Sequence, residues 1–233
     1  MNKPHISSWL RRVKAMIKGD PDGFLGQVSG VIHIGANTGQ ERDLYARYGL
    51  RVLWIEPIPE VFTALEANLA GYVGQRALKY LVTDKEGAEY PFNVASNFGA
   101  SSSILDLKRH KEIWPEVGFT RQIVLTSTTL AALLAREKID PAGYDALIMD
   151  TQGSELLVLQ GAQPVLKNFR FIKTEVPDFE AYAGCCQLAD IEAFLSARGF
   201  REYRRNRFAE RAGVGSYYDI TYCAGTGVPD RAL

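Results

Sequence analysis

The stretch ALIMDTQGSELLVLQGA, residues 146–162, joins a strongly apolar run to a single carboxylate. Four apolar residues precede Asp150, and Gly153 and Glu155 follow it within five positions. A short apolar run bounded by turn-forming residues is typical of a parallel strand that is covered on both faces. We therefore expect a buried central strand that ends at Asp150, and a short helix that begins just after Gly153.

The segments on either side of this stretch alternate between strand-like and helix-like patterns. Alternation of this kind predicts βαβ units and therefore a doubly wound α/β fold with a mostly parallel sheet. The expected strands are 30–37, 51–57, 78–84, 90–94, 121–127, 144–150 and 169–176, with a closing antiparallel hairpin at 201–208 and 216–223. The expected helices are 38–48, with Thr38 as N-cap, 59–68, 129–137 and 187–200, and 95–120 is expected to be irregular.

Composition narrows the class of protein. The 233 residues suffice for one sizeable domain, preceded by a basic amphipathic helix at 7–18. Lys plus Arg and Asp plus Glu both number 27, so no net charge directs the chain to nucleic acid or acidic membranes. We expect no membrane-spanning segment and no secretory signal. The three cysteines, Cys185, Cys186 and Cys223, lack zinc-ligand spacing and predict reduced thiols in a cytoplasmic protein.

Three strand ends bring polar residues to the edge of the sheet where such folds bind ligands. The first carries His33 and a turn with Gly35 and Gly39, the second ends at Glu56, and the third ends at Asp84. Glycines allow backbone to approach a ligand, and an acid about twenty residues further on is the usual partner of ribose hydroxyls. The turn is not the glycine pattern of dinucleotide sites, so S-adenosylmethionine is favoured over a dinucleotide, although both fit an adenosine site.

Four motifs carry a resemblance to a known family. They are VIHIGANTGQE (31–41), VLWIEPIPEVFTALEANL (52–69), FGASSSI (98–104) and LIMDTQGSELLVLQGA (147–162) followed by FIKTEV (171–176). In this order and spacing the chain resembles the FkbM family of S-adenosylmethionine-dependent methyltransferases over about residues 30–180. The resemblance implies a class I, Rossmann-like fold: a seven-stranded, mostly parallel sheet with a terminal antiparallel hairpin. It places the methyltransferase domain at 23–233, after an N-terminal helix and turn at 1–22.

The resemblance also implies roles for single residues. Gly35, Asn37 and Gly39 would line the methionine part of S-adenosylmethionine, Glu56 would bind its ribose, and Asp84 would lie near its adenine. Asp150 would sit beside the sulfonium. His33, Ala36, Thr38, Ser102 and Thr151 complete the predicted cofactor-binding set. The chain departs from the family at His33, where Asp is common, at Ala131, where an acid is common, and at Thr151-Gln152, where the family often has Val-Glu.

Methyl transfer to a hydroxyl needs the oxygen held in line with the methyl group, and a general base helps because a hydroxyl is a weak nucleophile. Asp150, His33 and His110 are the candidate bases, although each also has an ordinary structural role open to it. Ser103, Gln152, Glu155 and Glu175 are the candidate substrate contacts. No group of residues has the spacing of a metal site.

The sequence thus predicts an O-methyltransferase that acts on a hydroxyl of a sugar, a polysaccharide precursor or a natural product. The expected partner is a small-molecule or glycan acceptor rather than nucleic acid, and a homodimer is one assembly open to the chain. Two alternatives stay open: a nicotinamide-dependent oxidoreductase, and a module that binds a cofactor without catalysis.

Overall fold

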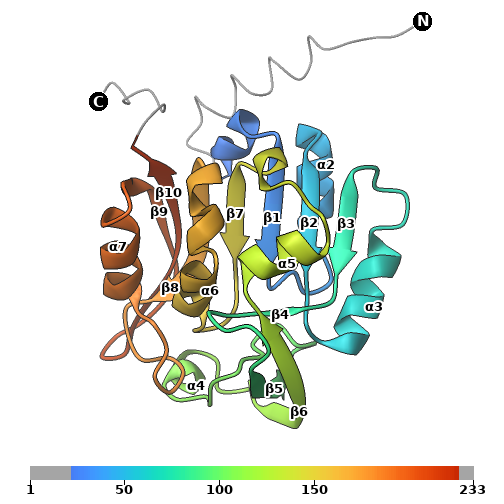
Figure 1. Ribbon diagram of the computed structural model, residues 1–233. Helices are drawn as coiled ribbons and strands as arrows, with labels where there is room; N and C mark the ends of the chain where they lie inside the picture. Colours follow the sequence, from blue (N-terminus) through green and yellow to red (C-terminus); the bar gives the residue numbers. More distant parts are fainter. Residues whose placement is uncertain (1–21, 226–233) are drawn as a thin grey trace, which may run out of the picture.

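The computed structural model describes residues 22–225 and contains a seven-stranded sheet (Figure 1). Its strands are, in spatial order, β3 (Gln75–Leu78), β2 (Arg51–Ile55), β1 (Gly30–Ile34), β7 (Ala146–Met149), β8 (Phe171–Pro177), β10 (Gly215–Ala224) and β9 (Phe200–Arg211). The five strands from β3 to β8 run parallel, and β10 is antiparallel to both β8 and β9. The predicted fold class, with its terminal antiparallel hairpin, is confirmed.

Helices cover both faces of the sheet, as a doubly wound fold requires. The 3-10 helix η1 (Gly23–Gln27) and the helices α2 (Arg42–Tyr48) and α3 (Pro59–Asn68) supply side chains to one buried cluster. On the other face α5 (Leu130–Arg136), α6 (Glu155–Gly161) and α7 (Leu188–Ser196) supply the second cluster. Two further 3-10 helices, η2 (Pro141–Gly143) and η3 (Gln163–Asn168), flank β7 and α6 in sequence.

Successive side chains of β1 point to opposite faces of the sheet and therefore belong to different buried clusters. Ile32 and Ile34 belong to the cluster on the α5–α7 face, whereas Val31 belongs to the cluster on the α2 face. His33 lies on that same α2 face, stacked on Trp54. Trp54 is fully buried, and burial of a large apolar side chain contributes about 1.5–3 kcal/mol.

A second, smaller sheet lies beyond the carboxyl ends of the parallel strands, at the bottom of Figure 1. It consists of β4 (Leu81–Val82), β6 (Phe119–Thr128) and β5 (Glu89–Ala95), and the short α4 (His110–Ile113) lies in the same region. The strands predicted at 90–94 and 121–127 belong to this small sheet rather than to the main one. The insertion therefore stands where ligands bind in doubly wound sheets.

Several predicted boundaries differ from the structure. The strand predicted at 78–84 is two pieces, because β3 ends at Leu78 and the chain then turns so that Leu81 and Val82 pair with β6. The helix predicted at 38–48 begins only at Arg42. Thr38 is not its N-cap, because Glu41 occupies the N-cap position, and Thr38 lies in the preceding turn, where its backbone N–H donates to the Asn37 side chain. The predicted helix at 7–18 lies outside the described residues, as does nearly all of the segment 1–22.

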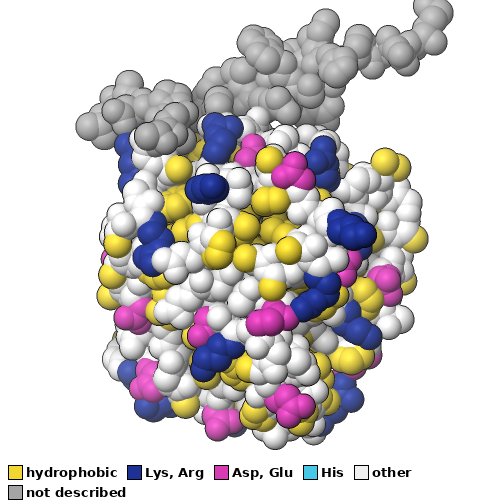
Figure 2. Space-filling view, viewed as in Figure 1, with side chains coloured by type: hydrophobic (Ala, Val, Ile, Leu, Met, Phe, Trp, Pro, Cys, Tyr) yellow, Lys and Arg dark blue, Asp and Glu magenta, His cyan; other side chains and the backbone are white. Residues whose placement is uncertain are grey.

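The surface carries charges of both signs. Figure 2 shows Lys and Arg side chains interspersed with Asp and Glu on the face that it presents, rather than gathered into one basic patch. Exposed ion pairs such as Arg76 with Glu137 and Lys108 with Glu180 belong to this mixed pattern. Among residues 22–225, no helix has the length and apolar character needed to cross a membrane.

Candidate active site

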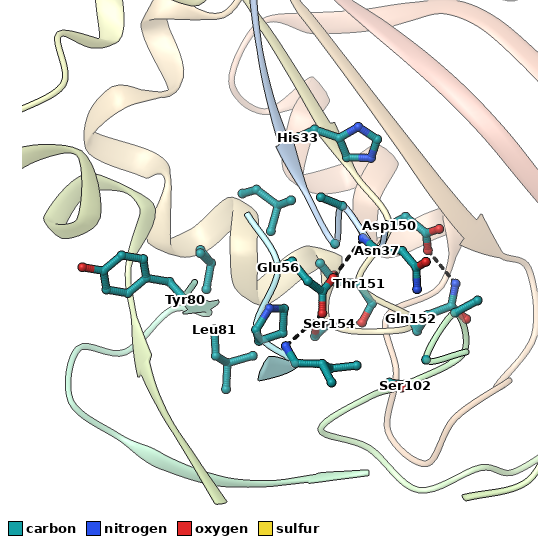
Figure 3. A pocket seen from close by; sticks show the side chains of 18 of the residues that line it. His33, Asn37, Glu56, Tyr80, Leu81, Ser102, Asp150, Thr151, Gln152 and Ser154 are labelled. Atoms are coloured by element: carbon teal, nitrogen blue, oxygen red, sulfur yellow. Dashed lines mark hydrogen bonds between the residues drawn. The ribbon is translucent and has the colours of Figure 1, made fainter. Parts of the chain in front are cut away.

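A pocket that is open to solvent lies at the carboxyl ends of β1, β2 and β7, with about 870 Å³ of empty space including its open side (Figure 3). Its walls come from the turn after β1, the end of β2, the segment that leads into β4, the loop 99–102 and the turn after β7. The predicted residues that line it are His33, Gly35, Ala36, Asn37, Glu56, Ser102, Asp150, Thr151 and Gln152. The structure therefore brings together residues from four separate motifs of the sequence.

The turn after β1 is built on Gly35 and Asn37. Gly35 has a φ of +80°, and a Cβ at this position would lie 1.8 Å from the backbone oxygen of Asp150. Asn37 has a φ of +43°, its Oδ1 accepts from the backbone N–H of Thr38 at 2.8 Å, and its Nδ2 donates to the oxygen of Phe98 at 3.1 Å. These contacts give the turn a fixed shape without the glycine pattern of dinucleotide sites.

Glu56 fastens this turn to the end of β2. Its side chain is 4% exposed, and its two oxygens accept from the backbone N–H groups of Asn37 and Ile58, each at 2.9 Å. Burial raises the pKa of Glu56 to about 7 in spite of these two hydrogen bonds. Figure 3 shows the carboxyl group in the wall of the cavity.

Asp150 stands at the end of β7, where it belongs to a hydrogen-bonded group. The Gln152 Nε2 donates to Asp150 Oδ1 at 2.5 Å and lies 3.2 Å from Glu175 Oε1. The Gln152 Oε1 accepts from the hydroxyl of Tyr182 at 2.7 Å. Burial raises the pKa of Asp150 to about 7, and burial together with the neighbouring Asp150 raises the pKa of Glu175 well above its usual range.

His33 is 5% exposed and has a fixed ring. Its Nδ1 lies 3.0 Å from the Tyr45 hydroxyl, and its ring stacks on Trp54 with the centroids 5.0 Å apart. Burial, followed by the charge of Lys173, lowers the pKa of His33 to about 3. The imidazole is therefore neutral at physiological pH, and it is a poorer proton acceptor than an ordinary histidine.

A second cavity, also open to solvent and with about 680 Å³ of empty space including its open side, adjoins the first. The two share His33, Glu41 and Asp150 in their walls. The remaining walls of the second cavity come from α2, β7, β8, β10 and the residue just before η1, and include Asp22, Tyr45, Lys173, Glu175 and Asp219. The Nζ of Lys173 is paired with Asp22 at 2.8 Å.

Several predicted site residues lie outside both cavities. The Nδ1 of His110 lies 2.7 Å from the Tyr217 hydroxyl, among the rings of Trp114 and Tyr182. Asp84 lies beside Gly161 instead of near the cavity, because β3 ends six residues before it and Tyr80, Leu81 and Val82 form that wall. Thr38 and Gly39 lie further along the first turn, where Gly39 packs closely against Leu65.

Two predicted substrate contacts instead hold the turn after β7. The carboxylate of Glu155 is buried and accepts from the backbone N–H groups of Thr151 and Gly153. The hydroxyl of Ser103 donates to the backbone oxygen of Gln152 at 2.8 Å. Both side chains therefore fix the position of Gln152.

No sequence motif pointed to several of the residues that line the cavities or contact their polar groups. Among them are Glu41, Tyr80, Lys173, Tyr182 and Asp219, which come from segments far apart in the chain. Only the register of the strands and the path of the insertion bring them to this edge. No group of three or more His, Cys, Asp or Glu side chains within residues 22–225 is arranged to hold a metal ion.

Comparison with known proteins identifies the family. A model described as the methyltransferase FkbM domain matches residues 33–202, well over half of the chain. The chain belongs to the FkbM methyltransferase family. The predicted family, the enzyme class and the cofactor S-adenosylmethionine are confirmed by this match. A search of curated proteins finds no significant match to the sequence.

Solved structures agree with the FkbM fold. The methyltransferase domain of METTL16 superimposes with a TM-score of 0.52 at 13% identity, over 97% of this chain and 71% of that one. TrmK of M. capricolum, solved with S-adenosyl-homocysteine, gives a TM-score of 0.50 at 8% identity, over 88% of this chain and 66% of that one. At these identities the likeness concerns the fold alone.

Proposed function

We propose that this FkbM protein is an O-methyltransferase that acts on a hydroxyl of a sugar, a polysaccharide precursor or a natural product. The observation that carries the proposal is the meeting of two cavities at Asp150. One cavity suits the cofactor, and the other offers space for an acceptor beside it. Bound S-adenosylmethionine supplies a methyl group on a positively charged sulfur, which keeps the electron pair of the broken bond as the new oxygen–carbon bond forms.

The first cavity fits an adenosyl ligand. Gly35 has no side chain to cover its backbone at the turn, and a Cβ there would collide with the backbone oxygen of Asp150, just after β7. Glu56 presents a buried carboxyl where the ribose of such ligands binds, and Leu81 with Val82 gives an apolar wall suited to a base. Gly35, Ala36 and Asn37 would hold the methionine part, Glu56 the ribose, and Asp150 with Thr151 the region of the sulfur.

The lining of the second cavity supports an acceptor without negative charge. Asp22 neutralises Lys173, whereas Glu41, Asp150, Glu175 and Asp219 add only acidic groups to the same walls. An acceptor with a phosphate or carboxylate would meet repulsion there, while hydroxyl and ammonium groups would find hydrogen-bond acceptors. This lining supports an uncharged or cationic hydroxyl compound and does not favour the phosphate backbone of a nucleic acid.

The three candidate bases differ in their position relative to the two cavities. Asp150 stands between the two cavities, where an acceptor hydroxyl would meet the methyl group. His33 lines both cavities as well, but its low pKa makes it a weak base. His110 lies outside both cavities. We infer that Asp150 takes the proton.

The three cysteines are free and buried, which supports a reducing compartment such as the cytoplasm.

Calorimetry followed by a turnover assay tests the proposal. S-adenosylmethionine and S-adenosylhomocysteine should bind, and NAD should not; binding of NAD alone would favour an oxidoreductase. Glucose, glucosamine and glucuronate then serve as acceptor probes with a common ring and different charge, alongside a wider set of hydroxylated compounds. We expect S-adenosylhomocysteine release with uncharged or cationic compounds. No release with any hydroxylated compound, despite cofactor binding, would instead indicate a module without catalysis.

A further inference from the structure

We propose that Asp150 and Glu175 act as one carboxyl pair, which Gln152 binds through its amide and Tyr182 holds in position. The inference rests on the proposed O-methyltransferase function and deepens it. Asp150 is the general base that touches the acceptor, Glu175 is its partner in the second cavity, and Gln152 and Tyr182 are positioning residues.

The side-chain amide of Gln152 links the two carboxyls through hydrogen bonds. Its Nε2 lies within hydrogen-bond distance of one oxygen from each carboxyl, 2.5 Å from Asp150 and 3.2 Å from Glu175. An amide nitrogen carries two N–H donors, so it can serve both carboxyls at once. A flipped amide would turn its oxygen toward two acidic oxygens, which makes the observed orientation the favourable one.

Tyr182 secures the opposite end of the same amide. Its side chain is 1% exposed, and its hydroxyl donates to Gln152 Oε1 at 2.7 Å, closer than the alternative acceptor, the oxygen of Ser101, at 3.2 Å. The backbone of Gln152 is also fixed, with a φ of +53° and the Ser103 hydroxyl on its carbonyl. The amide is thus held by its own backbone, by Tyr182 and by the two carboxyls.

The surroundings determine how many protons the pair holds. Glu155 from α6, Asp219 from β10 and Glu41 before α2 add negative charge near Asp150, and the pKa of Asp150 is raised to about 7 by its burial above all. Lys173 on β8 lines the same cavity but is paired with Asp22, and His33 on β1 is neutral. Near neutral pH the pair therefore holds about one proton, and the shorter hydrogen bond from Gln152 favours the ionised form of Asp150 and leaves this proton on Glu175.

This arrangement leaves one carboxylate oxygen of Asp150 available to accept the proton of the acceptor hydroxyl. The hydrogen bond from Gln152 occupies Oδ1 of Asp150, so Oδ2 can receive the hydroxyl proton. As the O–H bond breaks, its electron pair stays on the oxygen that bonds to the methyl carbon, and the proton joins the ionised carboxylate of Asp150. Glu175 stays protonated throughout, so the pair gains one proton in each turnover and releases it to solvent afterwards.

An NMR titration of carboxyl carbons tests the pair without an acceptor. Asp and Glu are labelled with ¹³C in the full chain, and the Asp150 signal is assigned with Asp150→Asn. The variants are Tyr182→Phe, which removes one hydroxyl, and Gln152→Gly, which removes the amide and tolerates the positive φ. Tyr217→Phe is the matched control, because its hydroxyl binds His110 and not Gln152.

We expect the wild-type midpoint of Asp150 near pH 7. Because a hydrogen bond to a charged group favours the ionised form by about 1.5–3 kcal/mol, Gln152→Gly should raise the midpoint by about 1–2 pH units. Tyr182→Phe should raise it by a smaller amount, and Tyr217→Phe should leave it in place. The acid limb of the turnover profile should shift in parallel with any acceptor that is found.

The proposal is overturned if wild-type Asp150 titrates near pH 4, or if Gln152→Gly and Tyr217→Phe give the same midpoint as wild type. It is also overturned if Tyr217→Phe shifts the midpoint as much as Tyr182→Phe does, because the effect would then be one of general packing. Failure to find any acceptor would contradict the proposed function but would leave the titration result standing, so the two failures can be told apart.

Discussion

Gly35 faces the backbone carbonyl of Asp150 so closely that a Cβ on residue 35 would lie 1.8 Å from that oxygen. The contact joins the end of β1 to the end of β7 and so places the cofactor turn beside the candidate base. Asp150 donates its own backbone N–H to the oxygen of Ile34 at 3.0 Å, which completes the junction. A single pair of residues therefore holds the turn after β1 against the proposed general base.

Gly35→Ala should destabilise the protein and abolish cofactor binding. The new methyl group meets a backbone atom that cannot move aside, and a positive φ adds about 1–2 kcal/mol. We expect a total loss of at least about 3 kcal/mol in the free energy of unfolding, measured by urea denaturation. Gly49→Ala is the control, because Gly49 has a φ of +69° but open space around it. Equal losses in the two variants would contradict the junction.

Glu56→Gln should weaken the binding of S-adenosylmethionine and lower stability. One of the two backbone N–H groups, of Asn37 or Ile58, would face an amide NH₂ and lose its acceptor. An unsatisfied buried donor costs about 1–3 kcal/mol. Calorimetry and urea denaturation measure the two effects, and the exposed Glu66→Gln on α3 is the matched control. Unchanged affinity in Glu56→Gln would remove Glu56 from the binding site.

The buried His33 predicts a specific pH dependence of stability. Its pKa is about 3 in the folded protein and about 6.5 when unfolded, so the unfolded chain binds more protons between these values. The contribution of His33 to stability is therefore complete above pH 6.5 and is lost as the pH falls toward 3. His33→Gln should lack this loss. Urea denaturation at pH 4, 5 and 7 measures it; identical pH profiles for wild type and variant would refute the prediction.

The buried carboxyls of Glu56 and Asp150 change the stability with pH in the direction opposite to that of His33. The pKa of Glu56 and of Asp150 is about 7 when folded, above the usual value, so the folded protein binds more protons between about pH 4 and 7. Their contribution is present at low pH and is lost as the pH rises through 7. The unfolding free energy of the cofactor-free protein should thus fall from pH 6.5 to 8, and Asp150→Asn should flatten this fall. A rise over the same range would contradict the raised pKa values.

The sequence predicts the fold well because the fold depends on local patterns. The apolar run before Asp150, the turn after His33 and the position of Glu56 each follow from residues that are neighbours in the chain. The strand at 78–84 was misplaced because Leu81 and Val82 are apolar in either sheet, and only their pairing with β6 decides between the two. The N-cap prediction at Thr38 was wrong because Gly39 has a left-handed φ of +73°, so the helix begins only at Arg42, with Glu41 at its N-cap position.

The polar contacts of the site were harder to predict because they depend on side-chain directions. Glu155 and Ser103 have the residue types of substrate contacts, but both point into the turn at Gln152. Tyr182 lies thirty residues from Gln152 in sequence, and no local pattern links the two. Asp84 shows how an error in one strand end moves a predicted ligand contact away from the cavity.

The rate of methyl transfer by Asp150→Asn, relative to wild type, tests the central claim most directly. The assay measures S-adenosylhomocysteine release with an uncharged or cationic hydroxyl acceptor, at cofactor concentrations that saturate both proteins. Loss of the base should lower kcat by about 10²–10⁴, with cofactor affinity within a few-fold of wild type, whereas His33→Gln should retain most activity. An Asp150→Asn enzyme as fast as wild type would contradict the assignment of Asp150 as the group that takes the proton.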